Sequence, residues 1–555
     1  MRTAGFALLS LLLAAPAAWA QQAVAFDWFE YVGKDAAFEQ PLPPGHYRNP
    51  ILAGFHPDPG IARAGDKYYL VNSTFGYFPG IPVFESDDLV HWRQIGSVID
   101  RPSQLDFDGL QLSRGVFAPT ISFHGGTFYV LNTAVDSGGN YIVTAKDPAG
   151  PWSEPVWLPT VGGIDTSLFF DDDGKAYLLN NDAPEGEPLY DGHRAIWLRE
   201  FDLEKLQPAG EAKVVVNGGM DIAQKPIWIE GPHLYKRDGW YYLSCAEGGT
   251  GPQHSQVVAR SRNVWGPYVP YEHNPILTQR DLPDDRAEPV TNAGHADLVE
   301  GRDGRWWAVF LASRNYGGTH YNTGRETYLL PVEWKDGWPT ILEHGRAIPR
   351  VAPAPSWVQG AARQAPLSGN FAWRDEFDQP RLDRAWLRVR VPKTAWADLA
   401  ARPGALTIHP LAENLDTLRN PSFLARRQQH LVFEASTALD VPARPGVAAG
   451  IAAFQNEAHW YFLGVRRTAG GKAQLFLEKS AGKPAETIAT ATLAAGKTLK
   501  LKIAGNEGAY SFGYDDGDGW RWLRQGEDGT ILSTDVAGGF VGATLGPYAR
   551  SEESE

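Results

Sequence analysis

Residues 65–71 read GDKYYLV, a glycine turn followed by aromatic and aliphatic residues. The same order of a turn, aromatic residues and an apolar run returns at residues 125–131, 173–179, 238–243 and 303–310. Gly-Gly and Asp-Gly pairs are hairpin-turn signals, and the runs that follow them have the composition of strands. The chain therefore repeats one strand-forming unit five times.

The spacing of these repeats predicts a particular architecture. The equivalent aromatic residues are separated by 48 to 65 residues. They are Tyr69, Tyr129, Tyr177, Tyr242 and Trp307. A repeat of this length with about four short strands is typical of a β-propeller blade. The repeats cover roughly residues 45 to 345, and we assign residues 21–345 to a five-bladed β-propeller domain.

The composition changes after the last repeat. Residues 346–370 hold several prolines with alanine and glycine between them, which is typical of a semi-rigid linker. From residue 371 to residue 555 strand-like segments return without a repeat, such as WYFLGV at residues 460–465. Such a succession of strands indicates a β-sandwich. The predicted fold class is all-β, a β-propeller followed by a β-sandwich domain.

Residues 1–20 have the features of a secretory signal peptide. Arg2 supplies a positive charge, an apolar run begins at Leu9, and residues 18–20 (AWA) form a small-x-small cleavage site. We therefore expect export to the periplasm or to the outside of the cell. Cys245 is the only cysteine, so no disulfide can form within the chain, and its strand-like surroundings predict a buried residue.

Charge and aromatic content narrow the possible partners. The chain has 51 basic and 65 acidic residues, a net charge of −14, which disfavours nucleic acid and anionic membranes because both are polyanions. Its 20 tryptophans and 21 tyrosines could offer aromatic faces to sugars. We expect a carbohydrate partner, no nucleic acid and no membrane; the oligomeric state stays open.

Polar residues recur at one position of different repeats, about ten to twelve residues before the aromatic strand. Loops that enter the inner strands of a propeller gather around its axis, so we expect these side chains to converge. They are Asp58, Asp165, Glu230 and His295. Pro57 and Pro59 flank the first of them and leave its backbone few conformations.

Carboxyl groups that face each other across a sugar are the apparatus for breaking a glycosidic bond. One of them must stay protonated, which requires burial or a neighbouring negative charge to raise its pKa. Glu230 lies between apolar residues and suits that role, with Asp165 raising its pKa and orienting it. Asp58, in a more polar turn, would stay ionised.

As a set, five motifs resemble glycoside hydrolase family 43, above all its β-xylosidase and α-L-arabinofuranosidase members with a trailing concanavalin-like β-sandwich. The motifs lie at residues 55–61 (FHPDPGI), 163–168 (GIDTSL), 229–234 (IEGPHL), 294–299 (GHADLV) and 324–327 (GRET). The resemblance extends over essentially the whole mature chain. It implies Asp58 as general base, Glu230 as general acid and Asp165 as the group that modulates the acid's pKa and orients it. It also implies an inverting mechanism, with a water activated opposite the acid.

The resemblance further implies which residues bind the sugar. Phe75 matches an aromatic wall of the pocket, and Phe117 occupies a position where these relatives often carry tryptophan. Arg325 matches an arginine that hydrogen-bonds the terminal sugar; the alternative is a structural ion pair with Glu326 or another acid. His295 matches a histidine that, in some members, coordinates calcium or its waters; the alternative is a neutral histidine that shapes the site. No cofactor is expected to be required, apart from a possible structural calcium ion near the propeller axis.

The expected activity is the exo-acting release of β-D-xylose or α-L-arabinofuranose from the non-reducing ends of hemicellulose oligosaccharides. One alternative is an endo-arabinanase, which needs an open groove that an appended sandwich would obstruct. Another is a retaining fructan hydrolase, which has a nucleophile in place of a base. A third is a non-catalytic carbohydrate-binding propeller, which the presence of all three carboxyl groups disfavours.

Overall fold

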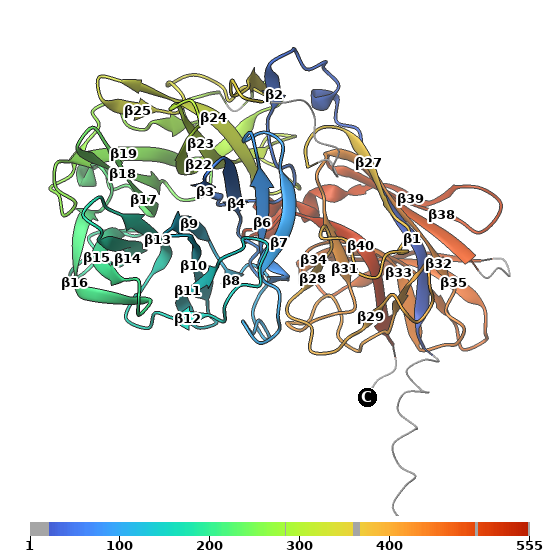
Figure 1. The fold of residues 1–555 in the computed structure, drawn as a ribbon. Coiled ribbons are helices and arrows are strands. Elements are labelled where there is room, and N and C mark those ends of the chain that lie inside the picture. The colour runs from blue at the N-terminus through green and yellow to red at the C-terminus, as the bar shows by residue number, and fades with distance from the viewer. Residues whose placement is uncertain (1–21, 284, 359–366, 494–497, 553–555) are drawn as a thin grey trace, which may run out of the picture.

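The computed structural model describes residues 22–283, 285–358, 367–493 and 498–552 (Figure 1). The predicted signal peptide, residues 1–20, lies outside the described residues. The structure is nearly all β: five sheets form the blades of a propeller, and two further sheets form a concanavalin-like sandwich beside it. The all-β fold of a five-bladed propeller and a sandwich is thereby confirmed.

Within each blade the paired strands are antiparallel. Blade one comprises β3 (Gly60–Ala64), β4 (Lys67–Val71), β6 (Gly80–Ser86) and β7 (Arg93–Ile99). Blade two comprises β8 (Gly115–Val116), β9 (Thr120–His124), β10 (Thr127–Val135), β11 (Gly139–Ala145) and β12 (Val156–Trp157). Blade three comprises β13 (Ile164–Phe170), β14 (Ala176–Asp182), β15 (Ala195–Asp202) and β16 (Gln207–Asn217).

The last two blades repeat this pattern and complete the ring. Blade four comprises β17 (Glu230–Arg237), β18 (Trp240–Glu247), β19 (Ser255–Ser261), β20 (Val269–Pro270) and β21 (Leu277–Thr278). Blade five comprises β22 (Val290–Glu300), β23 (Trp306–Arg314), β24 (Glu326–Lys335) and β25 (Trp338–Thr340). The short 3₁₀ helix η2 (Ile222–Gln224) precedes blade four.

The repeated aromatic residues lie on the second long strand of each blade and are buried between neighbouring blades. Tyr69 of blade one meets Phe128 of blade two edge-on, with ring centroids 4.9 Å apart. Tyr242 of blade four meets Trp334 of blade five in the same way at 5.0 Å. Large rings fill the space between twisted sheets, which explains why the repeat is marked by aromatic residues. Cys245 is fully buried on β18, as predicted.

The ring closes where the start of the propeller chain meets its end. Strand β2 (His46–Arg48) pairs antiparallel with β26 (Val351–Pro353), and the Asn49 side-chain amide donates to the Leu329 carbonyl of blade five. Part of the predicted linker, residues 346–370, is therefore a strand held against the propeller. Residues 359–366 of that linker lie outside the described residues.

Among the described residues, each sheet of the sandwich has eight strands. One sheet contains β1 (Val24–Gly33), β27 (Phe371–Asp375), β29 (Ala397–Asp398), β30 (Leu406–Ile408), β32 (Val432–Asp440), β37 (Thr498–Asn506), β38 (Ala509–Asp515) and β39 (Arg521–Asp528). The other contains β5 (Tyr77–Phe78), β28 (Leu387–Val389), β31 (Leu424–Arg427), β33 (Val447–Asn456), β34 (His459–Arg467), β35 (Ala473–Ala481), β36 (Glu486–Thr492) and β40 (Thr544–Ser551). Three short helices complete the described elements: η1 (Ala36–Phe38), η3 (Gly529–Leu532) and α2 (Thr534–Ala537). No helix in these described ranges has the length and apolar character needed to cross a bilayer.

The predicted domain boundary differs from the structure at the N-terminal end. Strand β1, blue in Figure 1, lies among the orange and red strands of the sandwich and pairs with β27, β30 and β32. Its apolar residues, such as Phe26 and Phe29, enter the core between the two sandwich sheets. The sandwich thus takes its strands from both ends of the chain, and residues 24–33 do not belong to the propeller.

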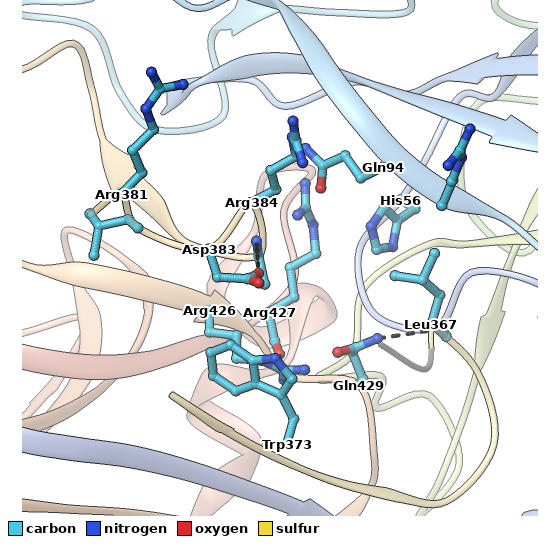
Figure 2. A pocket seen from close by; sticks show the side chains of 13 residues that line it. His56, Gln94, Leu367, Trp373, Arg381, Asp383, Arg384, Arg426, Arg427 and Gln429 are labelled. Carbon is cyan, nitrogen blue, oxygen red and sulfur yellow. Dashed lines mark hydrogen bonds between the residues drawn. The ribbon is translucent and has the colours of Figure 1, made fainter. Parts of the chain in front are cut away.

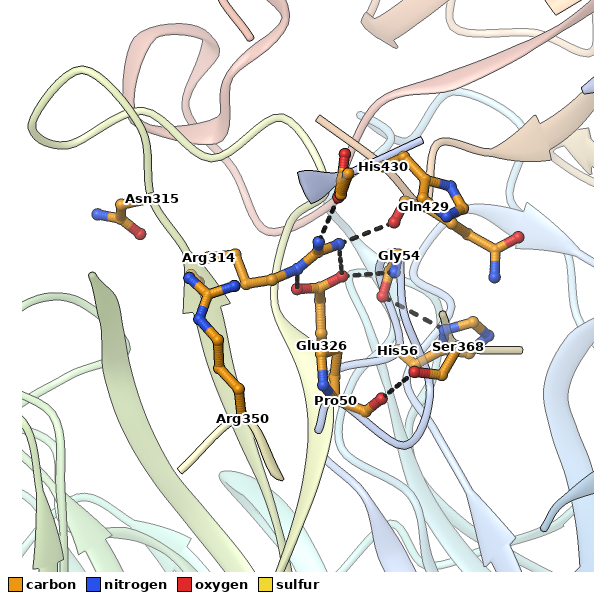
Figure 3. Close-up of polar contacts among 12 residues, drawn as sticks. Pro50, Gly54, His56, Arg314, Asn315, Glu326, Arg350, Ser368, Gln429 and His430 are labelled. Carbon is orange, nitrogen blue, oxygen red and sulfur yellow. Dashed lines mark hydrogen bonds and ion pairs between the residues drawn. The ribbon is translucent and has the colours of Figure 1, made fainter. Parts of the chain in front are cut away.

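The two domains are joined by strand pairing, apolar packing and buried charges. β5 leaves blade one to pair with β28 of the sandwich, and residues of both domains line a cavity between them (Figure 2). Arg314 of blade five contacts two buried carboxylates. One is Glu326 of the same blade at 2.6 Å (Figure 3). The other is Asp35, which lies just after β1, at 2.6 Å. Glu326 also accepts a 2.7 Å hydrogen bond from the backbone of Gly54.

Candidate active site

A cavity of 450 Å³ opens where the inner strands of the propeller face the sandwich. All the side chains that the sequence analysis proposed for the site line this cavity. They are Asp58, Phe75, Phe117, Asp165, Glu230, His295 and Arg325. They come from different blades: Asp58 precedes β3, Asp165 is the second residue of β13, Glu230 opens β17 and His295 lies within β22.

The backbone at several of these positions is in the left-handed region that is costly for residues with a side chain. The φ angles are 50° at Asp58, 58° at Asp165 and 52° at His295. The register of the strand pairs shifts at Asp165, Glu230 and His295, so each inner strand bulges as it reaches the cavity. Such strain persists only where surrounding contacts fix it, and bulges commonly redirect a side chain beside an active site.

Asp58 is held as an ionised carboxylate. Its Oδ2 accepts a 2.5 Å hydrogen bond from the Ser73 hydroxyl, and its Oδ1 lies 2.8 Å from the guanidinium of Arg325. Burial by itself would raise the pKa of Asp58, but the charge of Arg325, with His295 and Ser73, outweighs burial and holds that pKa below its usual range. The Asn72 amide fixes the loop behind it by donating to the carbonyls of His56 and Pro57.

Glu230 has the opposite electrostatic surroundings. Burial, followed by the negative charges of Asp165 and Asp58, raises the pKa of Glu230 well above its ordinary value. A carboxyl group with a raised pKa keeps its proton to higher pH and can donate it as a general acid. The apolar residues before Glu230 cover its side chain less than the sequence suggested. Ile229 is buried, but Ile227 and Trp228 are about two-fifths exposed.

Asp165 interacts electrostatically with the other two carboxyl groups. Its Oδ2 accepts a 3.0 Å hydrogen bond from the backbone N–H of Gly231, next to Glu230. Burial and the charge of Asp58 raise the pKa of Asp165 to about 7, while the Gly231 N–H favours its ionised form. Gly231 has φ +56°, and a Cβ there would meet the ring of His295 at 2.9 Å, so the close approach requires glycine.

Arg325 contacts Asp58 rather than Glu326, which is paired with Arg314. Its Nη1 also donates to the Thr250 hydroxyl at 2.9 Å, and its Nη2 donates to the Phe540 carbonyl at 3.3 Å. The structure therefore holds the guanidinium in the cavity wall, where its charge depresses the pKa of Asp58.

Three phenylalanines form one wall of the cavity. Phe75 and Phe117, both proposed from the sequence, meet edge-on with ring centroids 5.5 Å apart. The third, Phe540, stacks on Phe75 at 5.8 Å and comes from the sandwich, between α2 and β40. The sequence analysis did not identify Phe540, because no local pattern tells which loop reaches across a domain interface.

Arg194 and Trp228 also line the cavity and were not identified from the sequence as site residues. Arg194 donates twice to the Asn181 side chain, at 2.8 and 3.0 Å, and lies over the Trp228 ring at 5.1 Å. Neither residue belongs to a recognisable motif, so only the fold brings them to the mouth of the site.

His295 is buried, and burial lowers its pKa to about 4, so the ring is neutral at physiological pH. The surrounding residues do not assemble a calcium site by themselves. Calcium takes six to eight oxygen ligands, and no three His, Cys, Asp or Glu side chains among the described residues converge to hold a metal. The nearby carboxylate of Asp297 is engaged by Ile61 N–H at 2.8 Å and by the Tyr235 hydroxyl at 2.7 Å.

Comparisons with known proteins cover both domains of the chain. Residues 47–339 match glycosyl hydrolases family 43, and residues 374–555 match the β-xylosidase C-terminal concanavalin A-like domain. A xylosidase/arabinosidase of Butyrivibrio fibrisolvens is 40% identical over 91% of this chain and 95% of its own. The non-reducing end α-L-arabinofuranosidase BoGH43B of Bacteroides ovatus is 37% identical over 91% of each chain.

The solved structures give the same result. The crystal structure of a GH43_12 protein retrieved from a capybara gut metagenome superposes with a TM-score of 0.90 at 41% identity, covering 96% of this chain and 100% of that one. The match extends over both the propeller and the sandwich. The chain is a glycosidase and belongs to glycosyl hydrolase family 43.

Proposed function

We propose that this protein is an inverting glycosidase in which Glu230 protonates the leaving oxygen and Asp58 activates the attacking water. The opposite pKa shifts of these two carboxyl groups within one cavity are the observation that carries the proposal. Asp58 takes a proton from the water as its oxygen bonds to the anomeric carbon, and the aglycone leaves with the proton of Glu230. Asp165 keeps the acid protonated through its charge and positions it through Gly231.

The reaction is exo-acting. The Phe540 wall, which the sandwich supplies beside Phe75 and Phe117, supports this, because it closes one side of the cavity and disfavours a continuous groove. An endo-arabinanase, the second candidate, needs such a groove. A purely sugar-binding propeller would not need an acid and a base with opposite shifts.

The substrates are the non-reducing ends of hemicellulose oligosaccharides, with β-D-xylose and α-L-arabinofuranose as the released sugars. The names of the relatives support this class, since they include xylosidase/arabinosidase and non-reducing end α-L-arabinofuranosidase. Side-by-side assays of 4-nitrophenyl β-xyloside and α-L-arabinofuranoside show which of the two sugars the enzyme releases with the higher kcat/KM. If neither glycoside released 4-nitrophenol and linear arabinan were cleaved at internal bonds instead, the endo-acting candidate would be favoured.

The stereochemistry is tested by NMR of the first product formed. Inversion is expected to yield the anomer opposite to that of the substrate before mutarotation, whereas a retaining enzyme yields the same anomer. Retention would exclude the role given to Asp58 as a base acting on water.

Turnover requires no cofactor, because acid and base are both supplied by the chain. Dialysis against EDTA is therefore expected to leave kcat unchanged, with calcium re-addition as the control. A loss of activity restored by calcium would instead place an ion in the mechanism. The features of residues 1–20 support export to the periplasm or beyond, which fractionation of expressing cells tests by locating the activity.

A further inference from the structure

A second cavity, of 490 Å³, lies between the propeller and the sandwich, apart from the carboxyl groups of the candidate active site (Figure 2). Its lining is strongly basic: among the described residues that surround it, Asp383 is the single carboxylate. The arginines of the lining are Arg93, Arg381, Arg384, Arg426 and Arg427. Trp373 and Leu367 add apolar surface.

Two of these arginines are buried without an ion-pair partner. Arg426 is 4% exposed and Arg427 is 5% exposed, yet neither has a carboxylate within ion-pair distance in the part of the chain that the structure describes. Arg426 Nε and Arg427 Nη2 are buried and have no hydrogen-bond partner. Burial is the largest cause that lowers the pKa of both side chains to about 10, and the charge of Arg426 also contributes to the lowered pKa of Arg427.

Of the four other buried arginines among the described residues, three are paired with a carboxylate, and Arg199, which donates to the Thr160 carbonyl, is not. The three paired arginines are Arg314, Arg325 and Arg390. Cation–π contacts compensate the charges of Arg426 and Arg427 only in part. The Arg426 guanidinium lies over the ring of Trp373 at 4.7 Å, and the Arg427 guanidinium lies over the ring of Phe55 at 4.7 Å. A buried charge without a partner is destabilising, so the interface carries a cost that an anion would remove.

We propose that this cavity between the domains binds an oxyanion through Arg427 and Arg384. Figure 2 shows the side chains of Arg384 and Arg427 extending toward the same side of the cavity, beside Gln94. Guanidinium groups present planar forks of N–H donors that match carboxylate and phosphate oxygens. The volume is within the range of small-molecule sites, so the anion is either inorganic phosphate or the carboxylate of a sugar acid such as a hexuronate, whose ring would lie against Trp373.

The site is connected to the catalytic base. Arg427 Nε donates to the Phe55 carbonyl at 2.7 Å, and His56 lines the cavity. Asp58 follows two residues later on the same constrained loop. An anion bound by the Arg427 guanidinium would therefore be linked, through the Phe55 carbonyl, to the segment that positions Asp58.

Calorimetry with the full-length protein at constant ionic strength tests the proposal, with sodium phosphate and sodium glucuronate as ligands and neutral xylose as the control for sugar binding alone. We expect saturable binding of at least one anion at concentrations up to about 10 mM. Binding of phosphate only identifies an inorganic oxyanion; binding of glucuronate only identifies a sugar acid; binding of both identifies the shared oxyanion chemistry.

Two variants locate the site. Arg384→Gln, at an exposed position, and Arg427→Lys, which keeps the charge but loses the fork, are each expected to weaken anion binding about tenfold. Arg346→Gln, an exposed arginine outside the cavity, should leave it unchanged. The proposal would be overturned if neither anion bound saturably, or if wild type and Arg384→Gln bound the anion equally.

Discussion

At the scale of single residues, the site depends on two carboxyl groups of the same chemistry held in opposite states. Asp58 is buried and Glu230 is partly buried, and this burial by itself favours the protonated form of each. The difference is the position of Arg325, which touches Asp58 at 2.8 Å, whereas Glu230 faces the charges of Asp165 and Asp58. The contacts of one arginine therefore decide which carboxyl group is base and which is acid.

The first prediction concerns the base. Asp58→Asn keeps the shape of the side chain but cannot accept a proton, so kcat should fall between about 10²- and 10⁴-fold. Circular dichroism should be unchanged. Asp66→Asn is the matched control, because the Asp66 side chain is 82% exposed on a blade-one turn, and it should retain full activity. Wild-type turnover by Asp58→Asn would refute the assignment.

The second prediction concerns the pH profile. The active form needs Asp58 ionised and Glu230 protonated, so activity is lost below the lowered pKa of the first and above the raised pKa of the second. Asp165→Asn removes a negative charge that raises the pKa of Glu230. The alkaline limb of kcat/KM against pH should therefore move to lower pH, while exposed Asp173→Asn leaves it in place. An unmoved limb would show that Asp165 acts only through position.

At the scale of elements, the turn between α2 and β40 completes a pocket that belongs to the other domain. Gly539 has φ +80°, and a Cβ there would meet Ser113 Oγ at 2.2 Å, so glycine allows the turn to reach the propeller. The Ser113 hydroxyl accepts from the Phe540 N–H at 2.9 Å, and the Phe540 carbonyl accepts from Arg325. The turn thus fixes both the aromatic wall and the arginine.

Removing the ring at this turn gives the third prediction. Phe540 makes aromatic contacts with Phe75 and Phe117, each worth about 0.5–1.5 kcal/mol beyond area burial. Phe540→Ala should lower kcat/KM about tenfold, equivalent to about 1.4 kcal/mol, chiefly through KM. Trp522→Ala, at an exposed ring elsewhere in the sandwich, should have no effect on kinetics. Equal kinetics for Phe540→Ala would mean that the wall does not contact the sugar.

At the scale of the whole molecule, the sandwich is built into the propeller's structure. β1 precedes the propeller in sequence but lies in the sandwich, and β5 leaves blade one to extend the other sandwich sheet. Arg314 links these parts, since it pairs with Glu326 of blade five (Figure 3) and with Asp35 beside β1. Glu326 in turn holds the Gly54 N–H near the start of the catalytic loop.

Breaking this buried ion cluster gives the fourth prediction. Arg314→Met leaves two buried carboxylates without a counter-charge, so the free energy of unfolding should fall by about 3–5 kcal/mol in urea titrations. Arg402→Met is the control, because Arg402 is half exposed and its pairs with Asp27 and Asp440 should contribute at most about 1 kcal/mol. Similar losses in both variants would argue against a special role for the buried cluster.

The sequence by itself determined the features that repeat or that lie in local motifs. Turn-and-strand repeats with aromatic residues at 48- to 65-residue spacing predicted the five blades, because every blade must fill the same gap to its neighbour. The shared place of Asp58, Asp165, Glu230 and His295 within the repeats predicted that they meet, since a closed ring brings equivalent loops to one axis. The lining of the cavity contains all four.

Only the tertiary structure decided what crosses between domains. The pairing of β1 with the sandwich, the insertion of Phe540 into the pocket and the unpaired Arg426 and Arg427 depend on contacts between segments hundreds of residues apart. A strand pattern shows which face of the strand is apolar but not which sheet the strand joins. Likewise, the sequence around an arginine does not show which acidic residue, if any, will pair with it. Long-range packing supplies that information because burial and charge pairing are properties of the assembled interface.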